Sequence, residues 1–304
     1  MGTALVTGAT SGLGLEFAWQ LAQARHDLVL VARTPERLRE VAEEMRQFAG
    51  VQVEILQADL SQRDDLELVA KRLREKSKPV GLLVNNAGFG LGQRFVSGDL
   101  AREEQALDVM VRAVMVASHA AAGAMVERGR GAILNVSSMT AHTAMGTYAA
   151  HKAWVLRFTE GLAIELAGTG VTTTALCPGL VHTGFHAAAG IDETQWKGPV
   201  WLDAERVAVE GLEAVRRGQV ICTPSLCYRS ANAALRLAPR WLCAGRSSRS
   251  APTEPPSEAA GAQRGEKCHR WRLFTPDSCV LPRPLTSPTP LTCADVSWPG
   301  DAAA

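Results

Sequence analysis

Short apolar runs and longer amphipathic segments alternate along the chain up to Pro224. Most of the runs are rich in β-branched residues or leucine, which is typical of strands buried on both faces. The alternation predicts an α/β fold, a doubly wound parallel sheet with helices on both faces. The predicted strands are Ala4–Gly8, Asp27–Ala32, Val51–Leu56, Gly81–Asn86, Gly131–Ser138, Val171–Pro178 and Gln219–Pro224.

The segments between the runs have the periodicity of helices. The clearest spans Glu36–Phe48, where one face carries Leu38, Val41, Met45 and Phe48. Pro35 suits the first turn of this helix. Another helix is predicted over Leu13–Ala24, directly after the first strand.

The pattern ends near Gly245. We therefore predict a folded domain over residues 1–244 and a disordered Pro- and Ser-rich tail over 245–304. A regulatory extension would explain the tail, and so would a frameshifted 3′ end, which we favour. Cys268 beside His269 lacks the ligand spacing of a metal site, and no metal is expected.

The composition argues against several classes of protein. The net charge of +1 gives no electrostatic footprint for nucleic acid. We expect no signal peptide and no membrane span, and hence a cytoplasmic protein. The seven cysteines form no CxxC pair, so structural disulfides are not expected either.

The first strand runs into a glycine-rich turn, TALVTGATSGLG. A phosphate needs backbone N–H groups and no obstructing side chain, and a helix N-terminus supplies both. Gly8 would permit the tight turn, Gly12 the approach of a pyrophosphate, and Gly14 close packing of helix on strand. The spacing GxxxGxG differs from the GxGxxG dinucleotide fingerprint, and such turns also occur for structural reasons alone.

Several further motifs follow in order: NNAG at Asn85–Gly88, Ser138 after the fifth strand, YAAHK at Tyr148–Lys152 and PGLVHT at Pro178–Thr183. Together with the glycine turn they resemble the short-chain dehydrogenase/reductase family over about residues 1–243. The resemblance implies a Rossmann-like domain with strand order 3-2-1-4-5-6-7. It also implies hydride transfer between a nicotinamide dinucleotide and a carbonyl or alcohol.

The end of the second strand bears on the choice of coenzyme. Ala32 stands where an NAD-preferring site has a carboxylate, and the Arg33 guanidinium matches a 2′-phosphate. The resemblance therefore implies NADP(H), although Arg33 could instead be a solvated charge. The residues it implies for coenzyme binding are Gly8, Thr10, Ser11, Gly12, Leu13, Arg33, Asp59, Asn86, Ala87, Gly88, Tyr148, Lys152, Pro178, Gly179, Val181 and Thr183.

Carbonyl reduction needs a proton donor within hydrogen-bond reach of the oxygen, and Tyr148 is the candidate. Lys152 shares its helix face, so its ammonium is expected to lower the phenol pKa. Ser138 would hold the substrate oxygen. His142 and His151 flank these residues and are expected to be non-catalytic, because Tyr148 already fills the acid role.

Two features depart from the family pattern. Met110 stands where the family often has an asparagine that supports a water relay, and a thioether cannot replace an amide donor. Ser138 precedes Tyr148 by only ten residues, which leaves Ser137 as a fallback on the opposite strand face. A non-catalytic, dinucleotide-binding regulator of the same fold is therefore the alternative function.

The substrate and the oligomer are less determined. The segment 187–201 corresponds to a variable lid. Its Ile191, Trp196, Val200 and Trp201 indicate an apolar or acyl-chain substrate, or ordinary lid packing. The amphipathic segment Ala231–Leu242 could line the same pocket, although core packing is favoured. The resemblance implies a homodimer or homotetramer through helices around Leu107–Met125 and Tyr148–Leu166, packed on the small residues Ala117, Ala120, Ala121 and Ala124.

Overall fold

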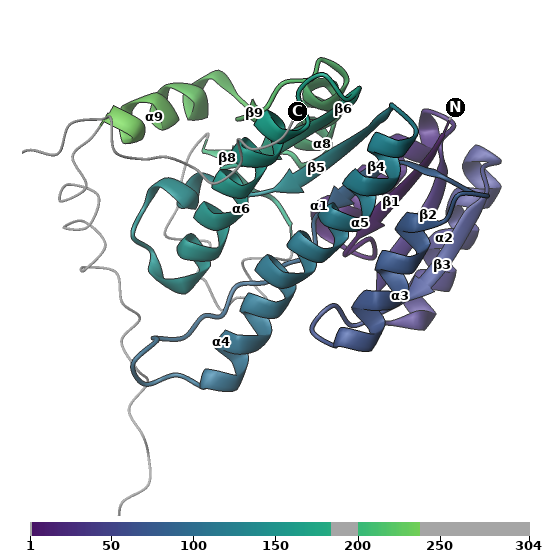
Figure 1. Ribbon diagram of the computed structural model, residues 1–304. Helices are drawn as coiled ribbons and strands as arrows, with labels where there is room; N and C mark the ends of the chain where they lie inside the picture. Colours follow the sequence, from purple (N-terminus) through teal and green to yellow (C-terminus); the bar gives the residue numbers. More distant parts are fainter. Residues whose placement is uncertain (1, 184–199, 238–304) are drawn as a thin grey trace, which may run out of the picture. The chain divides into compact units, whose positions relative to one another are not determined.

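The computed structural model describes residues 2–183 and 200–237 (Figure 1). The strands are β1 (Thr3–Thr7), β2 (Asp27–Ala32), β3 (Val53–Gln57), β4 (Val80–Asn85), β5 (Gly131–Val136), β6 (Val171–Leu176), β7 (Leu180–Val181), β8 (Trp201–Leu202) and β9 (Ile221–Cys222). The helices are α1 (Gly12–Gln23), α2 (Pro35–Ala49), α3 (Arg63–Arg74), α4 (Leu100–Leu107), α5 (Ala113–Glu127), α6 (Gly146–Glu165), α8 (Ala204–Arg216) and α9 (Leu226–Leu237). A π-helical turn, Asp108–Arg112, joins α4 to α5, and a 3₁₀ turn, Met139–His142, precedes α6.

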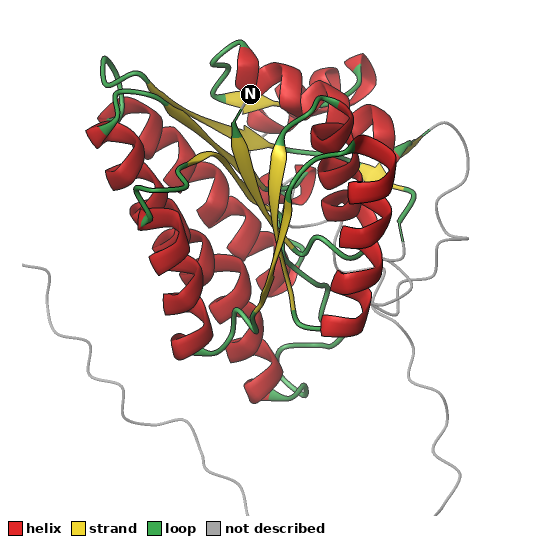
Figure 2. Ribbon diagram, turned by 90° about the vertical axis from the view of Figure 1, so that its right-hand side faces the viewer, coloured by secondary structure: helices red, strands yellow, loops and turns green. Residues whose placement is uncertain are grey.

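Seven strands form one parallel sheet in the order β3-β2-β1-β4-β5-β6-β9. The predicted order is confirmed, since β9 is the seventh strand of this sheet and β7 pairs separately with β8. Figure 2 shows the sheet between two layers of helices. In such a sheet, ligands bind beyond the carboxyl ends of the strands, where the order reverses beside β1.

Each sheet face has its own apolar core. Helices α1, α2 and α8 cover one face through residues such as Phe17, Met45 and Val207, whereas α3 and α5 cover the other. Leu38, Val41 and Met45 are fully buried, as the helical pattern predicts. Phe48 is not: it is 69% exposed and packs edge-on against Trp19, because α2 carries it beyond the core.

The alanine face of α5 packs within the chain. Ala117, Ala120 and Ala121 are buried in the core beneath α5, so the prediction that they pack against a second copy is wrong for these three. Ala124, the fourth residue of that prediction, is half-buried. The exposed apolar residues of this helix are Met115 and Val126. Among the described residues, the helical segment Leu100–Glu127 has the length and composition of a membrane span. Half of its most apolar window is buried inside the protein, which identifies it as a core helix of the fold.

The predictions that fall on residues 184–199 and 238–304 lie outside the described residues. They include most of the lid, the end of the segment Ala231–Leu242, the domain boundary near Gly245 and the tail.

Candidate active site

The glycine turn has the geometry of an anion cradle. Gly8 and Gly12 adopt φ values of +67° and +52°, which favour glycine. Ser11 precedes α1 without capping it through its side chain, so its hydroxyl leaves the first helical amides open to another acceptor. A Cβ on Gly14 would overlap the Gly8 carbonyl and the Asn86 amide. The predicted close packing of helix on strand is therefore present, and Thr10 and Leu13 lie in the same turn.

Thr7, which sequence reasoning missed, joins the ends of β1 and β4. Its buried hydroxyl accepts hydrogen bonds from the backbone N–H groups of Asn86 (3.0 Å) and Ala87 (3.1 Å) and donates to the carbonyl of Val84 (3.3 Å). The Asn86 amide donates in return to the Thr7 carbonyl (3.0 Å). The sequence feature that could have indicated this role is a threonine at the end of a buried strand. The NNAG segment is thus fixed against the glycine turn.

Two close approaches extend this framework toward the predicted catalytic residues. A Cβ on Gly12 would lie 3.4 Å from the Thr183 Cβ. A Cβ on Gly88 would lie 3.5 Å from Lys152 Nζ and 3.4 Å from Met110 Sδ. At the carboxyl edge of the sheet, the glycine turn therefore meets the Pro178–Thr183 segment, and the NNAG segment meets Lys152.

Ser138, which follows β5, comes together with Tyr148 and Lys152 of α6. The Ser138 hydroxyl is hydrogen-bonded to the Tyr148 phenol. Lys152 Nζ lies 5.7 Å from the centroid of the Tyr148 ring and donates to the Val136 carbonyl (2.8 Å). Ser137 has a different role. Its hydroxyl donates to the backbone carbonyl of Lys152 (2.7 Å) and so fixes α6 to β5.

Burial dominates the ionisation of this group. Although Tyr148 keeps some surface exposure, the packed protein around it raises its pKa, and the Ser138 hydrogen bond opposes the rise. Burial likewise lowers the pKa of the Lys152 ammonium to about 8. The sequence predicts a lowered phenol pKa. For the polypeptide itself that sign is wrong, because desolvation outweighs the Ser138 hydrogen bond, and the Lys152 ammonium donates to the Val136 carbonyl instead.

Arg33 and Asp59 lie at the other end of the same edge. They follow β2 and β3, whose last residues, Ala32 and Gln57, are paired. Asp59 accepts hydrogen bonds from the Ser61 amide (3.0 Å) and hydroxyl (2.8 Å). Arg33 is exposed and makes no ion pair with any residue that the structure describes.

The Pro178–Thr183 segment is held from several sides. The Pro178 carbonyl accepts a hydrogen bond from the Met139 amide (2.9 Å), one residue after Ser138. Val181 pairs with Leu202 across the β7–β8 ladder. Tyr228 of α9 lies against Gly179, a contact that sequence reasoning missed. Its signal was modest: Tyr228 is one of only two tyrosines in the chain.

A second buried polar group lies on a different face of α6. The Glu103 carboxylate, 7% exposed, accepts hydrogen bonds from the Thr147 hydroxyl (2.6 Å) and the Gln93 amide (3.0 Å). Burial lowers the pKa of His151, and the nearby Glu103 opposes this shift. The Thr147–Glu103 hydrogen bond joins α4 to α6.

Comparison with known proteins identifies the family. The protein-family model described as "short chain dehydrogenase" matches residues 2–194 of this chain. An uncharacterised oxidoreductase of Staphylococcus saprophyticus is 31% identical over 217 residues, which are 70% of this chain and 91% of that protein. Sulfoacetaldehyde reductase 2 of Chromohalobacter salexigens is 37% identical over 186 residues, which are 60% of this chain and 73% of that protein.

A solved structure agrees with these sequence matches. The short-chain dehydrogenase from Sphingobium yanoikuyae in complex with NADPH superimposes with a TM-score of 0.73 and 34% identity, over 84% of this chain and 99% of that one. The chain belongs to the short chain dehydrogenase family of oxidoreductases.

Proposed function

We propose that the chain transfers hydride between NADP(H) and a carbonyl or alcohol group, with Ser138, Tyr148 and Lys152 as its catalytic residues. The observation that carries the proposal is the convergence of these three side chains, with Lys152 beside Gly88 at the edge where the glycine turn opens α1. The Chromohalobacter relative is named as an aldehyde-reducing enzyme, and the Sphingobium structure contains NADPH; both support this activity.

The residues present fit a dinucleotide. The amides that follow Ser11 and the left-handed Gly8 and Gly12 suit a pyrophosphate. The exposed Arg33 guanidinium suits a 2′-phosphate, and the Asp59 carboxylate lies on the neighbouring strand end. The remaining residues proposed to hold it are Thr10, Leu13, Asn86, Ala87, Gly88, Tyr148, Lys152, Pro178, Gly179, Val181 and Thr183. When bound, the nicotinamide supplies the hydride.

The chain's own residues would handle the proton. Tyr148, whose pKa burial raises further above neutral, is protonated at neutral pH, which is the form that donates to a carbonyl oxygen. Ser138 would donate to the same oxygen and stabilise its developing charge. Lys152, with a pKa of about 8, is mostly charged at pH 7 and places a cation near the phenol. These protonation states are the ones that carbonyl reduction requires of the two side chains.

The test uses purified full-length protein, NADPH and a panel of aldehydes and ketones that includes long-chain and bulky members. Tyr148→Phe should lower kcat about 100-fold or more while NADPH binding persists. Ser138→Ala should also lower kcat, whereas Ser137→Ala should mainly lower thermal stability. If NADPH binds but wild type reduces nothing on the panel, the non-catalytic regulator replaces the enzyme. Equal rates for wild type and Tyr148→Phe would refute the assigned acid.

Coenzyme preference has its own test. Arg33→Asp should raise the KM for NADPH by roughly tenfold or more, with little change for NADH, because it removes a charge-assisted hydrogen bond. Arg37→Asp is the matched control, since Arg37 is a nearby exposed arginine that pairs with Glu40 (2.9 Å). An unchanged NADPH/NADH ratio for Arg33→Asp would reject the assignment of NADP(H).

A further inference from the structure

Tyr228 links the C-terminal helix to the loop that follows β6. Its ring lies so close to Gly179 that a Cβ at this position would overlap the ring. Its hydroxyl accepts a hydrogen bond from the Leu180 amide (3.1 Å) and donates one to the Val200 carbonyl (2.6 Å). The Tyr228 ring therefore contacts Gly179, and its hydroxyl is hydrogen-bonded to two backbone segments, at Leu180 and at Val200.

The braced loop connects two parts of the candidate site. At one end, the Pro178 carbonyl is bonded to the Met139 amide, beside Ser138. At the other end, Thr183 faces Gly12 in the glycine turn. Leu180 lies between Pro178 and Thr183 and directly precedes Val181. A movement of the Leu180 backbone would therefore shift the residues between these two ends.

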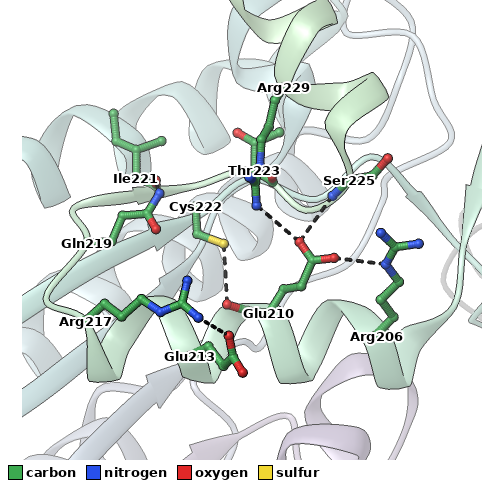
Figure 3. Close-up of polar contacts among 10 residues, drawn as sticks. All are labelled: Arg206, Glu210, Glu213, Arg217, Gln219, Ile221, Cys222, Thr223, Ser225 and Arg229. Carbon is green, nitrogen blue, oxygen red and sulfur yellow. Dashed lines mark hydrogen bonds and ion pairs between the residues drawn. The ribbon is translucent and has the colours of Figure 1, made fainter.

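Polar contacts hold the start of α9, the helix that carries Tyr228 (Figure 3). The Glu210 carboxylate of α8 accepts from the Ser225 amide (3.3 Å), pairs with Arg229 (3.5 Å) and binds Arg206 (2.9 Å). Arg229 also donates to the Thr223 carbonyl (3.0 Å). The turn before Tyr228 is thus fixed to β9 and α8.

We propose that Tyr228 is a positioning residue that holds the Gly179–Val181 backbone in place for the nicotinamide end of the coenzyme. This inference rests on the proposed function, because it assigns that backbone to the dinucleotide site. The contact also explains why residue 179 is a glycine: only a residue without a side chain leaves room for the Tyr228 ring. The adenosine end, at Arg33 and Asp59, follows other strands and should not depend on Tyr228.

The experiment compares two ligands on the full chain. Tyr228→Phe keeps the ring on Gly179 but removes both hydrogen bonds of the hydroxyl. We expect the dissociation constant of NADPH to rise about 5- to 10-fold, the scale of one or two lost hydrogen bonds. Adenosine 2′,5′-bisphosphate, which lacks the nicotinamide half, should bind within twofold of its wild-type value. In assays with NADPH deuterated at C4, Tyr228→Phe should show a larger kinetic isotope effect on hydride transfer than wild type.

The controls separate the possible failures. Leu226→Ala removes a side chain of the same helix that is 75% exposed, and it should leave both affinities unchanged. Gly179→Ala should repeat the selective loss of NADPH affinity because it displaces the ring. Equal losses for both ligands, or none for either, would overturn the positioning role. Failure of wild type to bind NADPH would instead reject the proposed function.

Discussion

Replacing Lys152 by methionine should stabilise the protein while it abolishes turnover. The Lys152 side chain is only 5% exposed, and burial lowers its pKa from 10.5 to about 8. At 1.36 kcal/mol per pKa unit, the charged ammonium costs about 3 kcal/mol of stability at pH 7. Methionine removes this cost but also the hydrogen bond to Val136, worth about 1 kcal/mol. The expected net gain is about 2 kcal/mol.

The pH dependence of this gain is the stricter test. Because the folded state holds the lysine proton less tightly than the unfolded chain, the cost is fully present below pH 8. It fades as pH rises from about 8 toward 10.5, where the unfolded lysine also loses its proton. The difference between Lys152→Met and wild type should therefore shrink from about 2 kcal/mol at pH 7 to near zero at about pH 9.5.

Denaturant unfolding of both proteins, followed by circular dichroism between about pH 6 and 9.5, measures these free energies. Lys71→Met is the matched control, because Lys71 is an exposed lysine of α3 and its removal should change stability by less than about 0.5 kcal/mol. A Lys152→Met protein that is less stable than wild type at pH 7, or a difference that does not vary with pH, would refute the reasoning.

Two further substitutions test the packing of the site. Gly14→Ala should lower stability by about 1–3 kcal/mol or more and weaken NADPH binding, because its Cβ would overlap the Gly8 carbonyl. The control Gly123→Ala, with no atom within 4 Å of its Cβ on α5, should stabilise by about 0.5–1 kcal/mol in thermal unfolding. Met110→Asn should cost about 1–3 kcal/mol, since an amide would enter an apolar cluster, whereas Met110→Leu should cost less than about 1.5 kcal/mol; wild-type stability for Met110→Asn would contradict the apolar surroundings.

The sheet was the most predictable part of the fold. Runs such as Asp27–Ala32 are apolar at every buried position, so their pattern has one interpretation, and Leu28, Val29 and Leu30 are indeed buried. Helix faces were less certain. The helical period places Phe48 with Met45, but whether a residue is covered depends on where the neighbouring layer ends.

Features that depend on distant parts of the chain escaped the sequence. An alanine stripe on α5 suits packing inside the chain as well as between chains, and only the sheet beneath Ala120 decides between them. The sign of the Tyr148 pKa shift depends on burial, which spacing to Lys152 does not reveal. The contact of Tyr228 with Gly179 joins residues 49 positions apart, and no local pattern predicts it.

The short spacing between Ser138 and Tyr148 has a local explanation, and it bears on turnover. The backbone after Ser138 coils into the 3₁₀ turn Met139–His142, where the Ser138 hydroxyl accepts from the Thr140 amide (3.2 Å). Gly146, with a φ of +67°, then turns the chain directly into α6. These two tight turns let ten residues connect the groups and still allow their hydrogen bond. The spacing therefore does not argue for a non-catalytic protein, and that alternative rests on Met110 alone.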